Sequence, residues 1–408
     1  MKSLDDACAD PASGFLRGRI VTPDGVLDDA VVSWADGVIT EVRAVTGDES
    51  TSQSIAAADD AAAPLVLPGL IDVHDHGALG HEFPGSDAAG CAIAAGHHRR
   101  HGTTTLLAST VSAAPDVLAR QVAVLADVAD NGIIDGIHLE GPFLNACRCG
   151  AQDPAAIVPG DPAVLEPILA AARGHMRTIT LAPETARLDE LLDVCADHGI
   201  VASLGHTDAD YAATAAAIAA AVDRGVPVTA THLFNAMPRI HHRDPGAAAA
   251  LLAAAVDGDA TVELIADGVH LSDAIVDLVR ATVGPDGIAL VSDAMAAAGM
   301  PDGDYVLGRL PVVVADGVAR LRTDDGEPGA IAGGTSTILD QVNRLRARGV
   351  DLADVARMAA TTGARAAGFP DRGAITVGKR ADLLVCSDTP TGALTPRTVI
   401  VAGAAQKA

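Results

Sequence analysis

Eight short apolar runs rich in β-branched residues recur through the middle of the chain, and a longer helix-like stretch follows each of them. Strands that alternate with helical stretches predict parallel βα units. Eight such units in roughly 300 residues match a closed (β/α)8 barrel, also called a TIM barrel. The predicted strands begin at Gly69, Thr103, Ile134, Thr178, Val201, Val226, Val262 and Ile288.

An open, doubly wound sheet is the main alternative to the barrel, because it also alternates strands with helices. Its first strand is normally followed by a Gly-rich phosphate-binding turn. The stretch Pro68-Gly-Leu-Ile-Asp-Val-His does not have that pattern. We therefore expect an α/β fold in which residues 68–377 form the (β/α)8 barrel.

The two ends of the chain have a different pattern from the middle. Residues 15–45 alternate apolar and polar positions around the turn sequences Pro23-Asp-Gly and Asp36-Gly. Such alternation is typical of short strands joined by tight turns. The same style returns near the C-terminus, in 373–403. We predict a small β-sandwich domain built from both chain termini, residues 1–67 and 378–408.

The formal net charge of −25 limits the partners of this chain. A strongly acidic surface repels phosphate backbones and anionic lipid, so we expect neither nucleic acid nor membranes as partners. Residues 1–14 contain three Asp and no apolar segment, which is not the pattern of a signal peptide. Six scattered cysteines in a chain this long imply no disulfide framework. The sequence thus favours a cytoplasmic protein.

Side chains with metal-ligand chemistry collect directly after five of the predicted strands. In a (β/α)8 barrel the carboxyl ends of all strands converge on one mouth, where active sites lie. In a His-X-His sequence on a strand both rings point to the same face, because side chains alternate. The six candidates are His74, His76, Glu140, His206, His232 and Asp293.

These residue types point to hydrolysis with a divalent metal. Neutral imidazole and carboxylate are good ligands for zinc, and iron and other ions accept the same set. A bound ion lowers the pKa of its water to about 7, which supplies hydroxide at neutral pH. Asp293 would hold that water and carry its proton, first as base and then as acid. We expect one or two ions per subunit, zinc before the others, with Glu140 able to bridge two.

The motifs that contain these residues resemble those of a known family. Pro68-Gly-Leu-Ile-Asp-Val-His-Asp-His-Gly resembles the opening motif of the amidohydrolase superfamily. The stretches His138-Leu-Glu-Gly-Pro-Phe-Leu and Thr231-His-Leu-Phe-Asn-Ala-Met resemble the N-acetylglucosamine-6-phosphate deacetylase family in particular. Further similar stretches are Leu181-Ala-Pro-Glu, Gly205-His-Thr, Ile265-Ala-Asp-Gly-Val-His and Ser292-Asp-Ala.

The resemblance implies how the metal ligands divide. Members of the family that keep the His-X-His pair bind a second ion with it, whereas members without it work with one. This chain keeps the pair, at His74 and His76. Asp293 would be the general acid and base. The main ion would be held by Glu140, His206 and His232.

The resemblance also implies contacts to an amino-sugar phosphate. His270 would hold sugar hydroxyls, and Asn235 and the Ala236 N–H would contact the phosphate. Arg243 would join them, since a guanidinium suits phosphate bidentately. The family pattern places this Arg in the site of a neighbouring subunit, which implies a homodimer.

One position departs from the family pattern. Gln152 stands where the better-known pattern has a His that helps to polarise the acetyl carbonyl. An amide donates a hydrogen bond but carries no charge, so carbonyl activation would fall more heavily on the second ion. Cys147 and Cys149 lie in the same loop, which we expect to be a lid.

The implied reaction is hydrolysis of the acetamide of N-acetylglucosamine 6-phosphate to glucosamine 6-phosphate and acetate, in amino-sugar catabolism or recycling. Three alternatives stay open. The first is the same reaction on the galactosamine epimer. The second is another amidohydrolase activity, such as that of a cyclic amidase or deaminase. The third is a scaffold without catalysis. A dihydroorotase-type site with a carboxylated Lys is disfavoured, because no Lys lies between Lys2 and Lys379.

Overall fold

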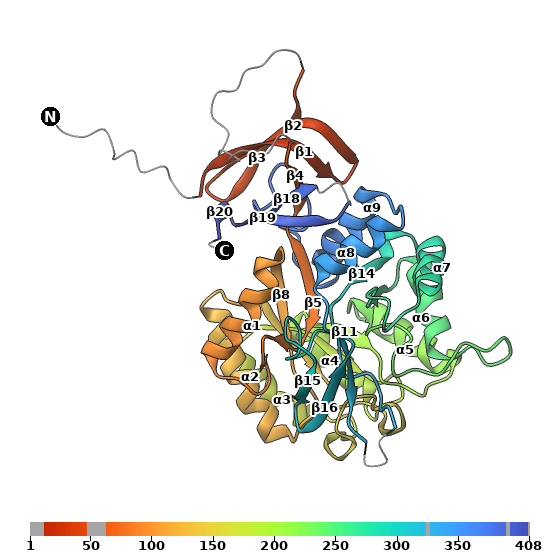
Figure 1. Cartoon of the computed structure of the whole chain (residues 1–408). Coiled ribbons are helices and arrows are strands. Elements are labelled where there is room, and N and C mark those ends of the chain that lie inside the picture. Colours follow the sequence, from red (N-terminus) through yellow and green to blue (C-terminus); the bar gives the residue numbers. More distant parts are fainter. Residues whose placement is uncertain (1–11, 47–62, 324–326, 389–391, 407–408) are drawn as a thin grey trace.

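The computed structural model describes residues 12–46, 63–323, 327–388 and 392–406. Figure 1 shows a large barrel with a smaller sheet packed on one end of it. The first and last described segments both lie in that smaller sheet. The prediction that the N-terminus is not a signal peptide falls mostly on residues 1–11, outside the described ranges.

The barrel contains all eight predicted strands, which pair in parallel in chain order. The fold prediction is therefore confirmed. Most of these strands are buried throughout, which explains why they appear as β-branched apolar runs. The strands are β5 (Leu70–Asp75), β8 (Thr103–Ser109), β9 (Gly136–Glu140), β10 (Met176–Leu181), β11 (Val201–Leu204), β12 (Val228–Ala230), β13 (Thr261–Leu264) and β14 (Ile288–Leu290).

The seam between the last strand and the first closes just beyond β14. Asp75 pairs in parallel with Ala294, and the Asp293 N–H donates to the His74 carbonyl over 2.9 Å. The His76 N–H donates to the Ala294 carbonyl over 2.7 Å. These bonds rule out the open, doubly wound sheet. They also place Asp293 beside the His pair, although more than 200 residues separate them in the sequence.

Helices surround the barrel, each with its apolar side on the strands (Figure 1). In α2, buried Leu118, Val122 and Leu125 recur at helical spacing. In α8, the Thr337 hydroxyl accepts from the Asp340 N–H while the Asp340 carboxylate accepts from the Thr337 N–H, which forms a capping box. The covering helices are α1 (Ala88–Arg100), α2 (Pro115–Asp130), α3 (Pro162–Ala172), α4 (Leu188–His198), α5 (Tyr211–Asp223), α6 (Gly246–Asp257), α7 (Asp273–Val283) and α8 (Ile338–Ala347).

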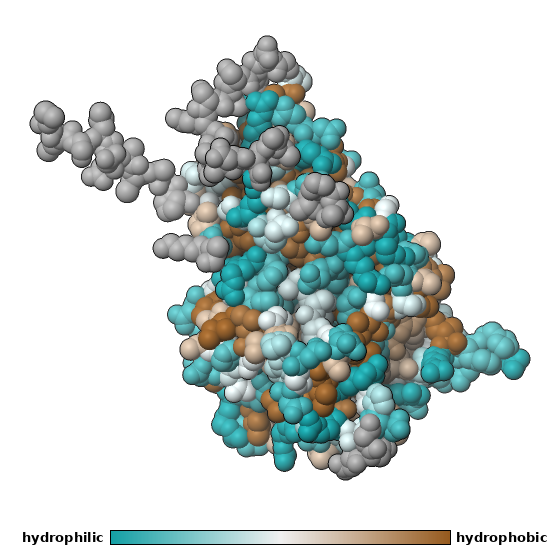
Figure 2. Space-filling view, in the orientation of Figure 1, coloured by the Kyte–Doolittle hydropathy of each residue, from teal (hydrophilic) through white to brown (hydrophobic). Residues whose placement is uncertain are grey.

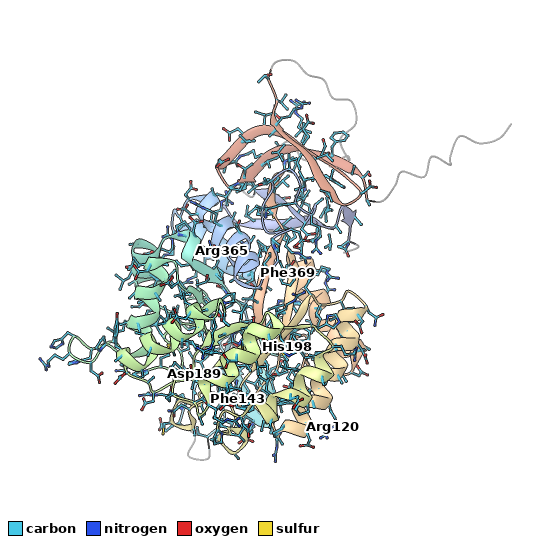
Figure 3. The ribbon with its side chains drawn as sticks, turned by 180° about the vertical axis from the view of Figure 1, so that it is seen from behind. Arg120, Phe143, Asp189, His198, Arg365 and Phe369 are labelled. Atoms are coloured by element: carbon cyan, nitrogen blue, oxygen red, sulfur yellow. The ribbon has the colours of Figure 1, made fainter. Side chains whose placement is uncertain are left out.

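Two further short helices, α9 (Leu352–Ala356) and α10 (Thr362–Ala366), follow α8. The helix α10 and the residues between the two helices pack on β5 and β14, outside the barrel seam. The chain then reaches Phe369, which lies below the terminal sheet in Figure 3. The guanidinium groups of Arg177 and Arg372 lie 5.1 Å and 4.6 Å from the centre of the Phe369 ring. This cation–π arrangement covers the end of the barrel opposite its mouth.

Segments from both chain termini form one seven-stranded sheet, in the order β20-β19-β18-β4-β1-β2-β3. The sheet curls back on itself: Val38, in the edge strand β3, pairs with Arg380, just before the interior strand β18. The curl encloses a core that contains Ile20, Trp34 and Leu383. The strands are β1 (Gly14–Thr22), β2 (Gly25–Ala35), β3 (Val38–Ala44), β4 (Leu65–Pro68), β18 (Leu383–Asp388), β19 (Leu394–Val401) and β20 (Ala404–Ala405).

The predicted sandwich is thus a single curled sheet. We propose the domain boundaries 1–67 with 378–408 and 68–377, because β4 ends at Pro68 and barrel strand β5 begins at Leu70. Residues 1–11, 47–62, 389–391 and 407–408 of the predicted terminal domain lie outside the described ranges.

A three-stranded antiparallel sheet after β14 was absent from the sequence prediction. It consists of β15 (Gly303–Leu307), β16 (Leu310–Ala315) and β17 (Val318–Leu321). Its apolar side packs on Val111 and Met295 at the barrel mouth. We call residues 303–323 and 327–333 the flap, since they stand over the site described below.

Across the described part of the chain, no helix is both long and apolar enough to cross a bilayer. The five described cysteines are all free, as expected for a chain without a disulfide framework.

Candidate metal centre and cavity

Two groups of three metal-ligand side chains meet at the carboxyl ends of the barrel strands. The His74 group is His74, His76 and Glu140, and the His232 group is Glu140, His206 and His232. Glu140 belongs to both: its Oε1 lies 3.1 Å from His206 Nε2 and 3.2 Å from His232 Nε2. Its Oε2 lies 3.3 Å from His76 Nε2. All five side chains are buried.

The nitrogen atoms of each group converge on one another. His206 Nε2 and His232 Nε2 are 3.1 Å apart, and so are His74 Nε2 and His76 Nε2. Lone pairs that converge in this way repel unless a positive charge lies among them. Imidazole nitrogens and a shared carboxylate are the donor set that zinc and similar ions prefer. The residues present therefore fit one or two divalent ions.

The protein fixes the orientation of one ring in each group. His74 Nδ1 lies 3.3 Å from Glu263 Oε2, and His206 Nδ1 lies 2.9 Å from the Arg148 carbonyl oxygen. Since each oxygen is an acceptor, Nδ1 carries the proton and the Nε2 lone pair faces the group. This hydrogen-bond arrangement is typical of histidines that ligate metals.

The electrostatics of the site favour positive charge. Burial lowers the pKa of His74, but Glu140 and Asp293 raise it by more, to well above its usual range. The same two carboxylates raise the pKa of His76 to about 9 against the effect of burial. Burial raises the pKa of Glu140, yet the surrounding histidines bring it well below its usual range. A cluster that attracts protons in this way also attracts a cation.

Several candidate residues have a left-handed backbone conformation. The φ angles of His206, His232, Ala236 and Asp293 are 47°, 30°, 51° and 47°. Non-glycine residues rarely adopt this left-handed region, and they do so mainly where surrounding structure enforces it at functional sites. The turn just after each strand aims these side chains into the mouth of the barrel.

Asp293 stands at the edge of the His74 group, between it and His270. Its Oδ1 lies 3.3 Å from His76 Nε2 and 3.5 Å from His74 Nε2. Burial raises the pKa of Asp293, but His74 and His76 lower it by more, to well below its usual range. Its Oδ2 lies 4.0 Å from His270 Nε2. The Asp267 carboxylate holds the other His270 nitrogen over 2.8 Å.

Gln152 contacts Glu140 directly. Its Nε2 donates to Glu140 Oε2 over 2.6 Å, and its Oε1 accepts from the Ser112 N–H over 2.6 Å. The resemblance implied a contact from Gln152 to the substrate carbonyl. In this structure both polar atoms of its amide are bound to the protein, and its side chain holds the carboxylate that the two metal groups share.

A cavity opens over the two groups. Asn235, Ala236, His270 and Asp293 line it, and the flap contributes an apolar side. No Lys or Arg occurs among the described residues that line it: His76, Glu140, Gly150, Ala151, Gln152, His206, His232, Asn235, Ala236, His270, Asp293, Leu307, Ala330, Ile331 and Gly333.

Arg243 lies apart from the cavity of its own chain. It is exposed and belongs to the segment between β12 and α6, which projects from the barrel at the right of Figure 1. Figure 2 shows this projection as hydrophilic. His241 and His242 in the same loop are exposed as well. The structure thus brings together every predicted site residue except Arg243.

Two carboxylates of the site were missed in the sequence. Glu263 is buried in β13 and contacts His74, and Asp267 holds His270. In the sequence, Glu263 is a single acidic residue inside the apolar run Val262-Glu-Leu-Ile. A buried charge is costly unless it is paired or hydrogen-bonded, so this position could have indicated a carboxylate of the site. His138, two residues before Glu140, is not available as a metal ligand, because Ser109 and Thr180 hydrogen-bond to its two ring nitrogens.

The chain matches the Amidohydrolase family over residues 65–405. It is 33% identical to N-acetylglucosamine-6-phosphate deacetylase of Bacillus subtilis (strain 168), over 90% of this chain and 91% of that protein. It is 32% identical to N-acetylgalactosamine-6-phosphate deacetylase of Escherichia coli O157:H7, over 90% of this chain and 93% of that protein.

Solved structures agree with these sequence relatives. The fold superposes with a TM-score of 0.85 on a mutant N-acetyl-D-glucosamine-6-phosphate deacetylase from Mycobacterium smegmatis, solved in complex with N-acetyl-D-glucosamine-6-phosphate. That protein is 38% identical, and the match covers 96% of this chain and 99% of the other.

Proposed function

Because this chain belongs to the amidohydrolase family, we propose that it hydrolyses the acetamide of N-acetylglucosamine 6-phosphate to glucosamine 6-phosphate and acetate. The observation that carries the proposal is one buried carboxylate, Glu140, shared by two histidine pairs beside Asp293 at the floor of a cavity. The named relatives that act on this substrate support the choice of sugar.

The residues that would hold the ions are those of the two groups. Zinc suits nitrogen ligands with a carboxylate best, although iron and other divalent ions accept the set. The presence of both groups supports two ions per subunit, with the His232 group as the main site. When bound, a divalent ion lowers the pKa of water and polarises a carbonyl oxygen.

Asp293 carries the proton in the proposed reaction. It accepts a proton from the attacking water as the water oxygen bonds to the acetamide carbon. When the C–N bond then breaks, Asp293 gives that proton to the departing nitrogen, which leaves as the amine of the sugar, and the acetyl group leaves as acetate. The position of its carboxylate, between the His74 group and His270, suits both transfers.

The cavity walls position the sugar. His270, fixed by Asp267, would hold a ring hydroxyl through Nε2. Asn235 and the Ala236 N–H would receive the phosphate on the side near the His232 group. Gln152 donates to Glu140 and so would keep that carboxylate in place for a bound ion, which would supply Lewis-acid activation of the acetyl carbonyl.

We propose that the missing positive charge for the phosphate comes from a second copy of the chain. A dianionic phosphate needs a cationic partner in an acidic protein, and no Lys or Arg lines the described cavity. Arg243 is exposed on a loop that projects outward, where a neighbouring subunit can receive it. The protein would then be a homodimer whose two sites each depend on both subunits.

Replacement of Arg243 with Ala should raise KM for N-acetylglucosamine 6-phosphate by about 10- to 100-fold, the cost of one charge-assisted contact to phosphate. The KM for unphosphorylated N-acetylglucosamine should not change. Steady-state kinetics on both substrates measure the difference. Arg239→Ala in the same loop is the matched control, and equal losses on both substrates would argue against the phosphate contact.

Acetate release tests the proposed function as a whole. Purified protein is assayed on N-acetyl amino-sugar phosphates of the gluco and galacto series, with metal content measured on the same sample. We expect acetate from the gluco substrate, and its loss after chelation and recovery on addition of zinc. A preference for the galacto substrate would favour the epimer that the Escherichia coli relative is named for.

Two other outcomes of that assay would favour a different function. Release of ammonia without acetate would favour a deaminase or cyclic amidase. A protein that holds no metal and releases nothing would favour a scaffold. The cytoplasm, where sugar phosphates are retained, is the proposed location.

A further inference from the structure

Glu263 is a buried carboxylate with no role in the mechanism above. It lies in β13, is 2% exposed, and points into the barrel beneath the metal groups. An acidic side chain inside an apolar strand is costly unless hydrogen bonds satisfy its oxygens. Its Oε1 accepts from the Thr229 hydroxyl over 3.1 Å and lies 3.4 Å from the Ser203 hydroxyl.

The other oxygen of Glu263 contacts one residue of each metal group. Oε2 lies 3.3 Å from His74 Nδ1, which belongs to the His74 group. It also accepts from the main-chain N–H of His232 over 3.2 Å, and His232 belongs to the other group. A single oxygen atom therefore links two residues that are far apart in the sequence and that belong to different metal groups.

The two contacts do different things. At His74 the acceptor keeps the proton on Nδ1, so the Nε2 lone pair faces Glu140 and His76. At His232 the acceptor anchors a backbone held at φ 30°, which is strained for a residue with a side chain. Neither His76 nor His232 has a hydrogen-bond partner for its own Nδ1 among the described residues. No hydrogen bond at Nδ1 therefore fixes the orientation of either ring.

We propose that Glu263 is a positioning residue that fixes both metal groups at once, through the tautomer of His74 and the backbone of His232. The proposal rests on the proposed function only in assuming that the groups bind divalent ions. Loss of the Oε2 acceptor should loosen both groups. The effect should be larger in the His74 group, where the ligand itself loses its orientation.

Glu263→Ala tests the proposal through metal content. The full-length protein is stripped with a chelator, reconstituted with Zn²⁺, and titrated against a chromogenic chelator. We expect affinity for at least one ion to fall by about 10- to 100-fold, the usual effect of removing the partner of a metal-bound histidine. Glu263→Met, which keeps the volume without an acceptor, gives the same test if the alanine variant does not fold.

Two further variants separate positioning from simple stability. The amide oxygen of Glu263→Gln can still accept from His74 and His232 while its NH₂ faces the two hydroxyls, so this variant should retain zinc within a few-fold of wild type. Thr229→Val removes the hydroxyl that donates to Oε1 and to Ser203 Oγ, leaves the contacts of Oε2 in place, and should bind zinc normally. A merely structural role would instead lower the melting temperature of all metal-free variants and leave their zinc affinity unchanged.

Two results would overturn the proposal. Wild-type zinc affinity in both the alanine and methionine variants would exclude a positioning role. So would an equal loss in the glutamine variant, because it keeps the acceptor. Since zinc binding is measured without substrate, a failure of acetate release in the wild-type protein would count against the proposed function and not against Glu263.

Discussion

Replacement of Asp293 with Asn should lower kcat by at least about a thousandfold while the metal content stays at the wild-type level. The asparagine amide has the same shape, but it cannot accept a proton from water and pass it to the leaving amine. General acid–base groups typically contribute a factor of about 10² to 10⁴, and this residue serves in both steps. The acetate assay gives kcat, and elemental analysis of the same sample gives the ions per subunit.

The control for this variant is Asp382→Asn, another buried carboxylate, which lies in the terminal sheet region and hydrogen-bonds to Ala402. It should keep normal kcat. Turnover near the wild-type rate in Asp293→Asn would remove Asp293 from the mechanism. Loss of metal together with turnover would instead make it a ligand, which its distances of 3.3 Å and 3.5 Å to His76 and His74 also allow.

Glu140→Ala should remove both ions and reduce acetate release to near background. Its two oxygens face all four histidines of the two groups, so the substitution would leave neither group with its carboxylate. Loss of a metal ion forfeits several kcal/mol of transition-state stabilisation, which corresponds to about a thousandfold or more in rate. Metal analysis and kcat on one preparation measure both effects.

His76→Ala provides the comparison for that variant, because His76 belongs to one group only. It should lose the ion of the His74 group and keep the other. Glu184→Gln is the matched carboxylate control, since Glu184 holds Asn145 and Thr207 outside the two groups. If Glu140→Ala kept one ion at wild-type affinity, the two groups would be independent of the shared carboxylate.

The sequence alone predicted the barrel, and it named most of the residues that the structure brings together around the cavity. Each barrel strand is a short apolar run, and apolar runs are visible without coordinates. His74 and His76 share a face because they are two residues apart on a strand, which is a local rule. The other candidate ligands follow from the global rule that parallel strands of a closed barrel end at one mouth.

Other features depended on contacts that no local pattern contains. The strands of the flap pair with one another and were not predicted from the sequence. Only their packing on Val111 and Met295 makes the flap part of the cavity. Gln152 was expected near the substrate, but the fold turns its amide toward Glu140 and Ser112. Glu263 became visible as a partner of His74 only through a 3.3 Å contact across 189 residues of sequence.

Residue types and strand periodicity by themselves determined the fold class, the chemistry of a divalent-ion site and the residues that could supply it. They suffice because burial and side-chain alternation act over a few neighbouring positions. The tertiary structure alone decided that one carboxylate serves both histidine pairs, that Asp293 sits beside them across the barrel seam, and that Arg243 stands outside its own cavity. Those facts depend on distances between segments remote in sequence, which only closure of the barrel fixes.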